Sequence, residues 1–365
     1  MHEELLYVIA LSNIRGLGPV KAKSLLEHLG SAKAIFREKP NSLCSIPEIG
    51  KVTAQSLRSI DYHRAEREVE FILREGIRVA TWQDSHYPER LRRCDDSPII
   101  LYAKGKFDWN PLKVISIVGT RRADNYGKQF CCSLIESLKS YEPCIISGLA
   151  HGIDASAHTA SVENNLPTIA CVAHGLDQIY PSIHKSLATR MSDNGGIISE
   201  FISQTPIAPE MFPMRNRIIA GMSDCTIVIQ TDLRGGSMIT AHTAHSYGRE
   251  VFAVPGRASD PLSRGCHKLI RTNVAAILTS GEDLIHYLQW DQPTKSAQSQ
   301  LRFPENLDPN TSAVFDVILS NPNCSFDELL IQTQLTWGIL NTSLLQLEFE
   351  GLIQSLPGKR YRSKS

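Results

Sequence analysis

The sequence contains little that would tie the chain to a membrane or to an oxidising compartment. No apolar run approaches the ~20 residues that a membrane-spanning helix needs, and the start, MHEELLYVIALS, has two early glutamates where a signal peptide would have basic residues. The nine cysteines are an odd number and include no C-x-x-C pair, which favours buried thiols in a reducing cytosol over disulfides or a zinc framework. We therefore expect a cytoplasmic protein that makes no use of a membrane.

The chain has no net charge with neutral histidines, because 38 lysines and arginines are balanced by 38 aspartates and glutamates. The chain thus lacks a global field that would attract nucleic acid, and any site for a polyanion has to come from local clusters of basic residues. Its 365 residues are enough for two or three domains, and 42% hydrophobic residues are enough for a buried core.

Two strand-like segments near the middle of the chain run directly into glycine and polar residues. The first reads VISIVGTRR from Val114, and the second reads CIISGLAHG from Cys144. A segment with helical spacing follows each of them, which gives the strand, turn, helix order of a parallel sheet. Because ligands bind such sheets at the carboxyl ends of the strands, these loops are the first candidates for a binding site.

Similar apolar runs recur every 24 to 30 residues, which fits a strand plus a crossover helix. They begin at Val114, Cys144, Thr168, Gly196, Cys225, Val251 and Ala275. We expect an α/β fold with an extended, Rossmann-like parallel sheet, which would gather these loops along one rim. Two short strands at 77–82 and 99–102 are expected to extend the sheet on one edge.

The first 66 residues are expected to form a helical domain, and they contain a weak internal repeat. IRGLGPVKAKSL from Ile14 matches IPEIGKVTAQSL from Ile46, 32 residues later. Both copies have the helix-hairpin-helix pattern, in which a glycine-closed turn points backbone amides at a nucleic-acid phosphate. A small helical bundle with glycine helix stops explains the pattern equally well, and Glu48 in the place of Gly16 weakens the second copy as a phosphate contact.

A polar linker divides the rest of the chain. We expect the Rossmann-like domain at 67–290, the linker at 291–312 and a third domain at 313–365. Three helical segments followed by two short strands predict a winged helix in this last part. The basic residues that crowd its end are Lys359, Arg360, Arg362 and Lys364. DNA binding and a protein–protein module with a solvated basic tail both remain open for it.

Four loops of the predicted sheet carry groups suited to an anion. Gly119 permits a tight turn, Thr120 is a candidate cap for the next helix, and Arg121 can contact a phosphate with two nitrogens. Phe212 beside arginines combines base stacking with phosphate binding, as single-stranded nucleic acid requires. The predicted DNA-binding residues are Gly119, Thr120, Arg121, Arg122, Ser147, Gly148, Gly152, Phe212, Arg215, Asn216, Arg217, Gly235, Gly236 and Ser237.

No nucleophile with a base, and no pair of catalytic acids, can be assembled from the sequence. The glycine pair at 235–236 is typical of an anion nest, but no lysine follows it as in a Walker A loop. His242 and His245 lie three residues apart on a predicted helix without a third metal ligand. We therefore predict a binding protein rather than an enzyme, with no cofactor and no metal.

Together these motifs resemble the DNA-processing protein A family (DprA, also called Smf). The resemblance covers about residues 70–288. It rests on VGTRRADNYG, SGLAHGIDASAHTAS, FPMRNRIIAG, GGSMITAHTA, GREVFAVPG and SRGCHKLIRTNVAAI, in that order. The helix-hairpin-helix-like beginning and the winged-helix-like end also fit the family's common three-part organisation.

The resemblance implies a cytoplasmic bacterial protein that binds incoming single-stranded DNA during natural transformation. Such a protein protects the DNA and helps to load the recombinase RecA onto it. The resemblance also implies a homodimer, and an extended Rossmann domain with a basic pocket that Arg121 lines. Phe212, Arg215 and Arg217 match its aromatic and basic segment. The residues that match its phosphate-facing loops are Gly119, Ser147, Gly148, Gly235, Gly236 and Ser237.

The chain departs from the family at one point of this pocket. Family members often have a lysine just ahead of the matched phenylalanine, whereas this chain reads APEM at 208–211. Arg122 and Arg257 are candidates to supply the missing charge.

Two other functions fit parts of the sequence. A nucleotide-processing or nucleotide-sensing enzyme would need a carboxylate near the glycine nest, for which Glu200 and Asp232 are the candidates. A transcription regulator would use the winged helix on duplex DNA.

Overall fold

The computed structural model describes residues 2–58, 60–290, 307–321, 323–356 and 359–363. The chain forms two compact units, Met1–Gln292 and Pro293–Ser365. Most of the predicted linker, 291–306, lies outside the described residues, as do Lys364 and the turn at 357–358 of the predicted wing. Within the described ranges, no helix combines the length and the apolar character needed to cross a membrane.

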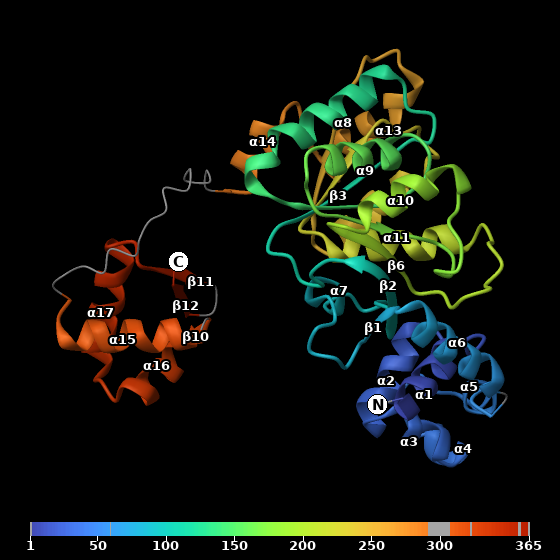
Figure 1. The fold of residues 1–365 in the computed structure, drawn as a ribbon, viewed down its shortest axis with the longest axis horizontal. Helices are drawn as coiled ribbons and strands as arrows, with labels where there is room; N and C mark the ends of the chain where they lie inside the picture. Colours follow the sequence, from blue (N-terminus) through green and yellow to red (C-terminus); the bar gives the residue numbers. More distant parts are fainter. Residues whose placement is uncertain (1, 59, 291–306, 322, 357–358, 364–365) are drawn as a thin grey trace. The chain divides into compact units, whose positions relative to one another are not determined.

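A nine-stranded sheet organises the first unit (Figure 1). Its strands are β1 (Arg78–Thr81), β2 (Ile100–Lys106), β3 (Val114–Gly119), β4 (Cys144–Ser147), β5 (Thr168–Cys171), β6 (Gly195–Ser199), β7 (Cys225–Ile229), β8 (Glu250–Ala253) and β9 (Ala276–Ile277). They lie in the order β1-β2-β6-β5-β4-β3-β7-β8-β9. The seven strands from β3 to β9 are parallel, and β1 and β2 add antiparallel strands beyond β6. The predicted parallel sheet with its edge extension is therefore confirmed.

The strands are buried on both faces, because their alternate residues enter two different cores. In β3, Val114 and Val118 pack on one side, and Ile115 and Ile117 on the other. The first side is covered by α7 (Glu89–Arg92), α11 (Met211–Met222), α12 (Gly236–Ser246) and α13 (Arg264–Arg271). The second is covered by α8 (Asn125–Ser137), α9 (Ile153–Glu163), α10 (Lys185–Met191) and α14 (Gly281–Tyr287). Short 3₁₀ turns occur at Lys139–Tyr141, Ser182–His184 and Pro261–Ser263.

Six helices precede the sheet and share a core with its strand β2, through Ile100 and Tyr102. They are α1 (His2–Ser12), α2 (Pro19–Leu29), α3 (Ala32–Arg37), α4 (Pro40–Leu43), α5 (Lys51–Ser56) and α6 (Tyr62–Glu75). The last of them continues past position 66, where the sequence suggested a domain boundary. In the internal repeat, Gly16 and Glu48 both have a left-handed backbone, with φ of 82° and 66°. Glu48 therefore preserves the turn while adding a negative charge.

The second unit is a three-helix bundle with a small sheet, as a winged helix requires. Its helices are α15 (Pro309–Ser320), α16 (Phe326–Thr333) and α17 (Trp337–Phe349), and its strands are β10 (Cys324–Ser325), β11 (Ile353–Leu356) and β12 (Arg360–Ser363). The strand order is β10-β12-β11, with β11 and β12 as the antiparallel wing. Helix α15 begins at Pro309, capped by Asp308, and so occupies the end of the predicted linker.

Candidate functional site

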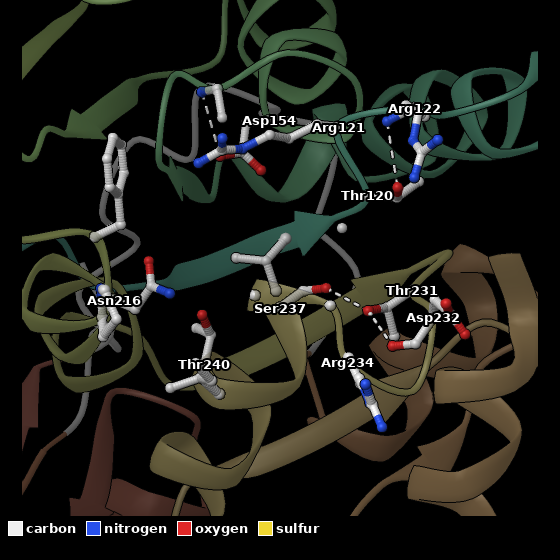
Figure 2. A pocket seen from close by; sticks show the side chains of 18 of the residues that line it. Thr120, Arg121, Arg122, Asp154, Asn216, Thr231, Asp232, Arg234, Ser237 and Thr240 are labelled. Carbon is white, nitrogen blue, oxygen red and sulfur yellow. Dashed lines mark hydrogen bonds between the residues drawn. The ribbon is translucent and has the colours of Figure 1, made fainter. Parts of the chain in front are cut away.

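A cavity of about 970 Å³ opens at the carboxyl ends of β3 and β7, the neighbouring strands from which the sheet extends in opposite directions. The strands β4, β5 and β6 follow β3 on one side, whereas β7, β8 and β9 extend the sheet on the other. The loops that leave β3 and β7 thus diverge at the carboxyl ends of neighbouring strands, which is where open α/β sheets bind ligands. Figure 2 shows the cavity with Arg121 and Arg122 above the end of β3, and with Arg234 and Ser237 on the opposite side.

Ten of the fourteen predicted residues line this cavity. They are Gly119, Thr120, Arg121, Arg122, Phe212, Arg215, Asn216, Gly235, Gly236 and Ser237. They come from three loops or helix starts that lie far apart in the sequence, so the fold assembles them into one place. The cavity walls do not include Ser147, Gly148, Gly152 and Arg217.

The loop after β3 is shaped by the close approach of β7 and α9. A Cβ atom on Gly119 would lie 2.1 Å from the carbonyl oxygen of Ile229, so only glycine fits there. The backbone N–H of Thr120 donates to the Gln230 carbonyl at 2.7 Å, and its Oγ1 accepts from the N–H of Arg122 at 3.2 Å. The expected role of Thr120 as a helix cap is wrong, because Asp124 caps α8.

Arg121 contacts an aromatic ring that also lines the cavity. Its guanidinium carbon is 5.1 Å from the centroid of the Phe212 ring, within cation–π range. The ring of Tyr180 lies beyond it, 6.4 Å from that of Phe212. Arg121 is exposed and Phe212 half-buried, so both remain accessible to a ligand.

The loop after β7 forms the other wall. The hydroxyl of Ser237 donates to Oγ1 of Thr231 at 2.7 Å, which ties the start of α12 to the end of the strand. A Cβ on Gly235 would lie 2.3 Å from the same Thr231 oxygen, whereas Gly236 faces open space. The start of α12 therefore presents unobstructed backbone to the cavity, in the manner of an anion site at a helix N-terminus.

Arg234 is the principal site residue that sequence reasoning missed. It lines the cavity and is exposed, between Leu233 and the glycine pair. Its place in the loop LRGGS, directly before the predicted anion nest, was the available signal. Of the two arginines considered as replacements for a missing lysine, Arg122 lines the cavity and Arg257 does not.

The cavity has an excess of positive charge. Among the residues that the structure describes, no carboxylate lies within 4 Å of the cationic nitrogens of Arg121, Arg122 or Arg234. The acidic residues on its walls are Asp154 and Asp232. An anion entering the cavity would therefore meet three arginines without an ion-pair partner.

Arg215 has a more structural role at the base of the cavity. It is only 4% exposed, and it donates to the carbonyl oxygens of Gly148, at 2.6 Å, and Cys171. A Cβ on Gly148 would lie 2.6 Å from both this guanidinium and the carboxylate of Asp154. Burial raises the pKa of Asp154, and the positive charge of Arg215 opposes that shift.

The predicted placement of Arg217 is wrong. Its guanidinium is buried in an ion pair with Glu200, and it also donates to the carbonyl oxygen of Asp96. Each side chain of the pair is only 10% exposed. Burial raises the pKa of Glu200 to about 7, although Arg217 acts in the opposite direction. Arg217 therefore links α11 to the segments that contain Glu200 and Asp96, and its charge is not available to the cavity.

The loop after β4 supports the cavity from behind. The buried hydroxyl of Ser147 donates to the carbonyl of Ile117 at 2.6 Å, so the expected contact of Ser147 with a ligand is corrected to a link between strands. Gly152 has a φ of 78°, and a Cβ there would lie 2.2 Å from the carbonyl oxygen of Thr120. Gly152 thus lets α9 begin directly against the loop after β3. Gly148 borders a small adjoining pocket with Tyr180 and Phe212.

Comparison with known families matches each part of the chain to a separate model. Residues 78–289 match the family described as DNA recombination-mediator protein A. Residues 8–59 match a SAM-like helix-hairpin-helix tandem, and residues 298–359 match the DprA winged helix domain.

Individual relatives agree with these matches. The chain is 39% identical over 202 residues to a DNA processing protein DprA of Streptococcus pneumoniae, covering 55% of this chain and 71% of the relative. The crystal structure of a DprA from Streptococcus pneumoniae superposes with a TM-score of 0.66 at 31% identity, covering 77% of this chain and 96% of that one. A Helicobacter pylori DNA processing protein A, whose structure concerns its single-stranded DNA binding mode, gives a TM-score of 0.53 at 30% identity, covering 58% and 96%.

Proposed function

This chain belongs to the DNA recombination-mediator protein A family, and on that premise we propose that it binds single-stranded DNA in the cavity between the ends of β3 and β7. The observation that carries the proposal is the meeting of three unpaired arginines, an open helix start and an accessible aromatic ring in one cavity. A flexible polyanion with planar bases is the ligand whose chemistry matches all three.

The proposed contacts divide between the DNA backbone and the bases. Arg121, Arg122 and Arg234 contact phosphates, and the amides at the start of α12 receive another phosphate oxygen. Phe212 provides a face on which a base stacks. None of these groups reads the hydrogen-bonding edge of a base, so we expect binding that tolerates many sequences and weakens strongly with salt.

We further propose that this binding protects DNA entering the cell in natural transformation and assists loading of RecA, as part of a cytoplasmic homodimer. Family membership supports this role.

We also propose the domain organisation inferred from the sequence, with helical, Rossmann-like and winged-helix domains. The first proposed boundary, between 66 and 67, falls within α6, which spans Tyr62–Glu75.

The direct test is competition between DNA forms for the full chain. A fluorescein-labelled oligothymidine should bind in a titration followed by anisotropy, and unlabelled single strands should displace it at lower concentration than duplex of the same length. Arg121→Ala should weaken binding about tenfold, because one phosphate contact and the arrangement of Phe212 are lost. Equal competition by duplex together with normal binding by Arg121→Ala would overturn the proposal.

The enzymatic alternative receives less support from the geometry. Glu200 is committed to Arg217, and Asp232 is the remaining candidate carboxylate at the cavity, where its Oδ1 accepts from the N–H of Leu233 at 2.7 Å. We therefore propose binding without turnover. Release of free base from a nucleoside monophosphate by the wild type, lost in Asp232→Asn, would favour an enzyme instead.

A further inference from the structure

The winged helix lacks the charge that its fold would need to read DNA through its third helix. DNA-binding proteins of the helix-turn-helix type place a recognition helix in the major groove, and their affinity depends heavily on lysine and arginine contacts to phosphates. From position 309 to position 350, which includes α15, α16 and α17, the sequence has no lysine, arginine or histidine. The same stretch contains five acidic residues, namely Asp316, Asp327, Glu328, Glu348 and Glu350, and all five are exposed.

Helix α17 instead presents apolar side chains to solvent. Trp337 is 61% exposed, Leu345 49% and Phe349 91%. Leu345 and Phe349 are four residues apart and lie on one side of the helix, whereas Trp337, eight residues before Leu345, lies at the edge of that side in the first turn. The buried side of the same helix consists of Leu340, Leu344 and Leu347. The helix is therefore apolar both toward its own core and along part of its outer face. A surface helix of a globular protein normally has a polar outer face.

Among the residues that the structure describes in this unit, the cations lie in the wing. Lys359, Arg360 and Arg362 belong to β12 or its approach, and two of them already have polar partners within the unit. Arg360 donates to the carbonyl of Asn323 at 3.2 Å, and Arg362 to the side-chain oxygen of Gln354 at 3.1 Å. Positive charge is thus available at the wing but absent from the helices.

From this distribution we propose that the outer face of α17 is a docking surface for a protein segment with an apolar centre and a rim of lysine or arginine. Trp337, Leu345 and Phe349 provide the apolar contact area, and aromatic side chains contribute strongly at such surfaces. The exposed Glu348 and Glu350 at the end of α17 complement a basic rim and disfavour the approach of a phosphate backbone. This inference goes beyond the DNA-binding function of the cavity and does not depend on it.

The test uses the full chain and a designed peptide as the probe. The peptide is an 18-residue, fluorescein-labelled helix of leucine and lysine with leucine along one side, and its control has the same composition in scrambled order. We expect the ordered peptide to bind at least tenfold more tightly than the scrambled one, as measured by anisotropy. The double variant Leu345→Glu, Phe349→Glu should abolish that preference, because it places charge in the apolar centre.

Control variants distinguish docking of the peptide on α17 from a general electrostatic attraction between the peptide and the protein. Val52→Glu changes another exposed apolar residue, whose 78% exposure lies between those of Leu345 and Phe349, in α5 of the first unit, and should leave peptide binding unchanged. Should the double variant melt at lower temperature, the milder Leu345→Asn variant replaces it. Equal binding of the two peptides, or equal binding by wild type and the α17 variant, would overturn the proposal. A loss of duplex DNA binding in the α17 variant would also overturn it, because the helix would then contact DNA.

Discussion

The guanidinium of Arg121 lies 5.1 Å from the centre of the Phe212 ring, and this contact joins the loop after β3 to the start of α11. A cation over one face of an aromatic ring is worth about 0.5–1 kcal/mol at an exposed site. In the proposed site, this contact keeps the charge proposed to bind a phosphate next to the ring on which a base is proposed to stack.

Replacing the ring tests the stacking half of this arrangement. Phe212→Leu keeps most of the apolar volume but removes the π face, so we expect oligothymidine to bind about 5- to 150-fold more weakly, as stacking contributes about 1–3 kcal/mol per base. Phe212→Tyr preserves the face and should bind within twofold of the wild type. Anisotropy titrations at fixed salt make the comparison. Unchanged affinity in Phe212→Leu would remove the ring from the site.

The corrected position of Arg217 gives a second prediction. Arg217→Met leaves the buried carboxylate of Glu200 unpaired, which typically costs about 3–5 kcal/mol. The free energy of unfolding in urea should fall accordingly, and Glu200→Gln in the same chain should restore part of it. DNA affinity of the folded variants should change less than twofold. A strong loss of affinity at unchanged stability would return Arg217 to the binding site.

The two neighbouring glycines of the loop after β7 should respond differently to alanine. In Gly235→Ala, the added Cβ collides with Oγ1 of Thr231, which accepts the hydroxyl of Ser237, so the loop has to move. We expect DNA affinity to fall about tenfold. Gly236→Ala meets open space and serves as the matched control for stability, with a change below about 1 kcal/mol. Wild-type DNA affinity in Gly235→Ala would argue against an ordered anion site there.

A buried histidine beneath the cavity predicts a pH dependence of stability. His158 in α9 is fully buried, with Nδ1 2.7 Å from Oγ1 of Thr168, and burial lowers its pKa to about 3. Between that value and the unfolded pKa of about 6.5, the unfolded chain binds the extra proton, so the contribution of the neutral ring is present above pH 6.5 and is lost on acidification.

The measurement compares wild type with His158→Asn in urea at several pH values. The stability difference between them should shrink by about 2 kcal/mol between pH 7 and pH 5, because only the wild type must exclude a proton from this position. A difference that stays constant over this range would show that His158 does not titrate as its burial predicts.

The sequence predicted the sheet because its strands are buried on both faces and therefore appear as uninterrupted apolar runs. Val114, Cys144 and Cys225 each begin such a run and each begin a strand. The same logic located the cavity, since the loops that follow parallel strands share one rim. Local patterns did not show that one helix crosses position 66, because α6 is amphipathic over the whole of Tyr62–Glu75 and its packing on α1 is a tertiary contact.

Which arginines line the cavity could not be predicted from the sequence alone. Arg215 and Arg217 lie in one motif, yet the first borders the cavity and the second is buried against Glu200. Two positions apart on a helix, they point in different directions, and only the tertiary structure supplies the carboxylate. Arg234 was not predicted, because the anion site was assigned to the two glycines that follow it.

The salt dependence of oligothymidine binding tests the central claim most directly, in wild type and in the double variant Arg121→Ala, Arg234→Ala. These exposed arginines line opposite walls of the cavity, so their loss should leave the fold intact while removing two phosphate contacts. We predict weaker binding and a slope of log affinity against log salt that is shallower by about 1.4, since each phosphate contact contributes about 0.7 for single strands. An unchanged slope and affinity would contradict the account, because the cavity would then not hold the DNA backbone.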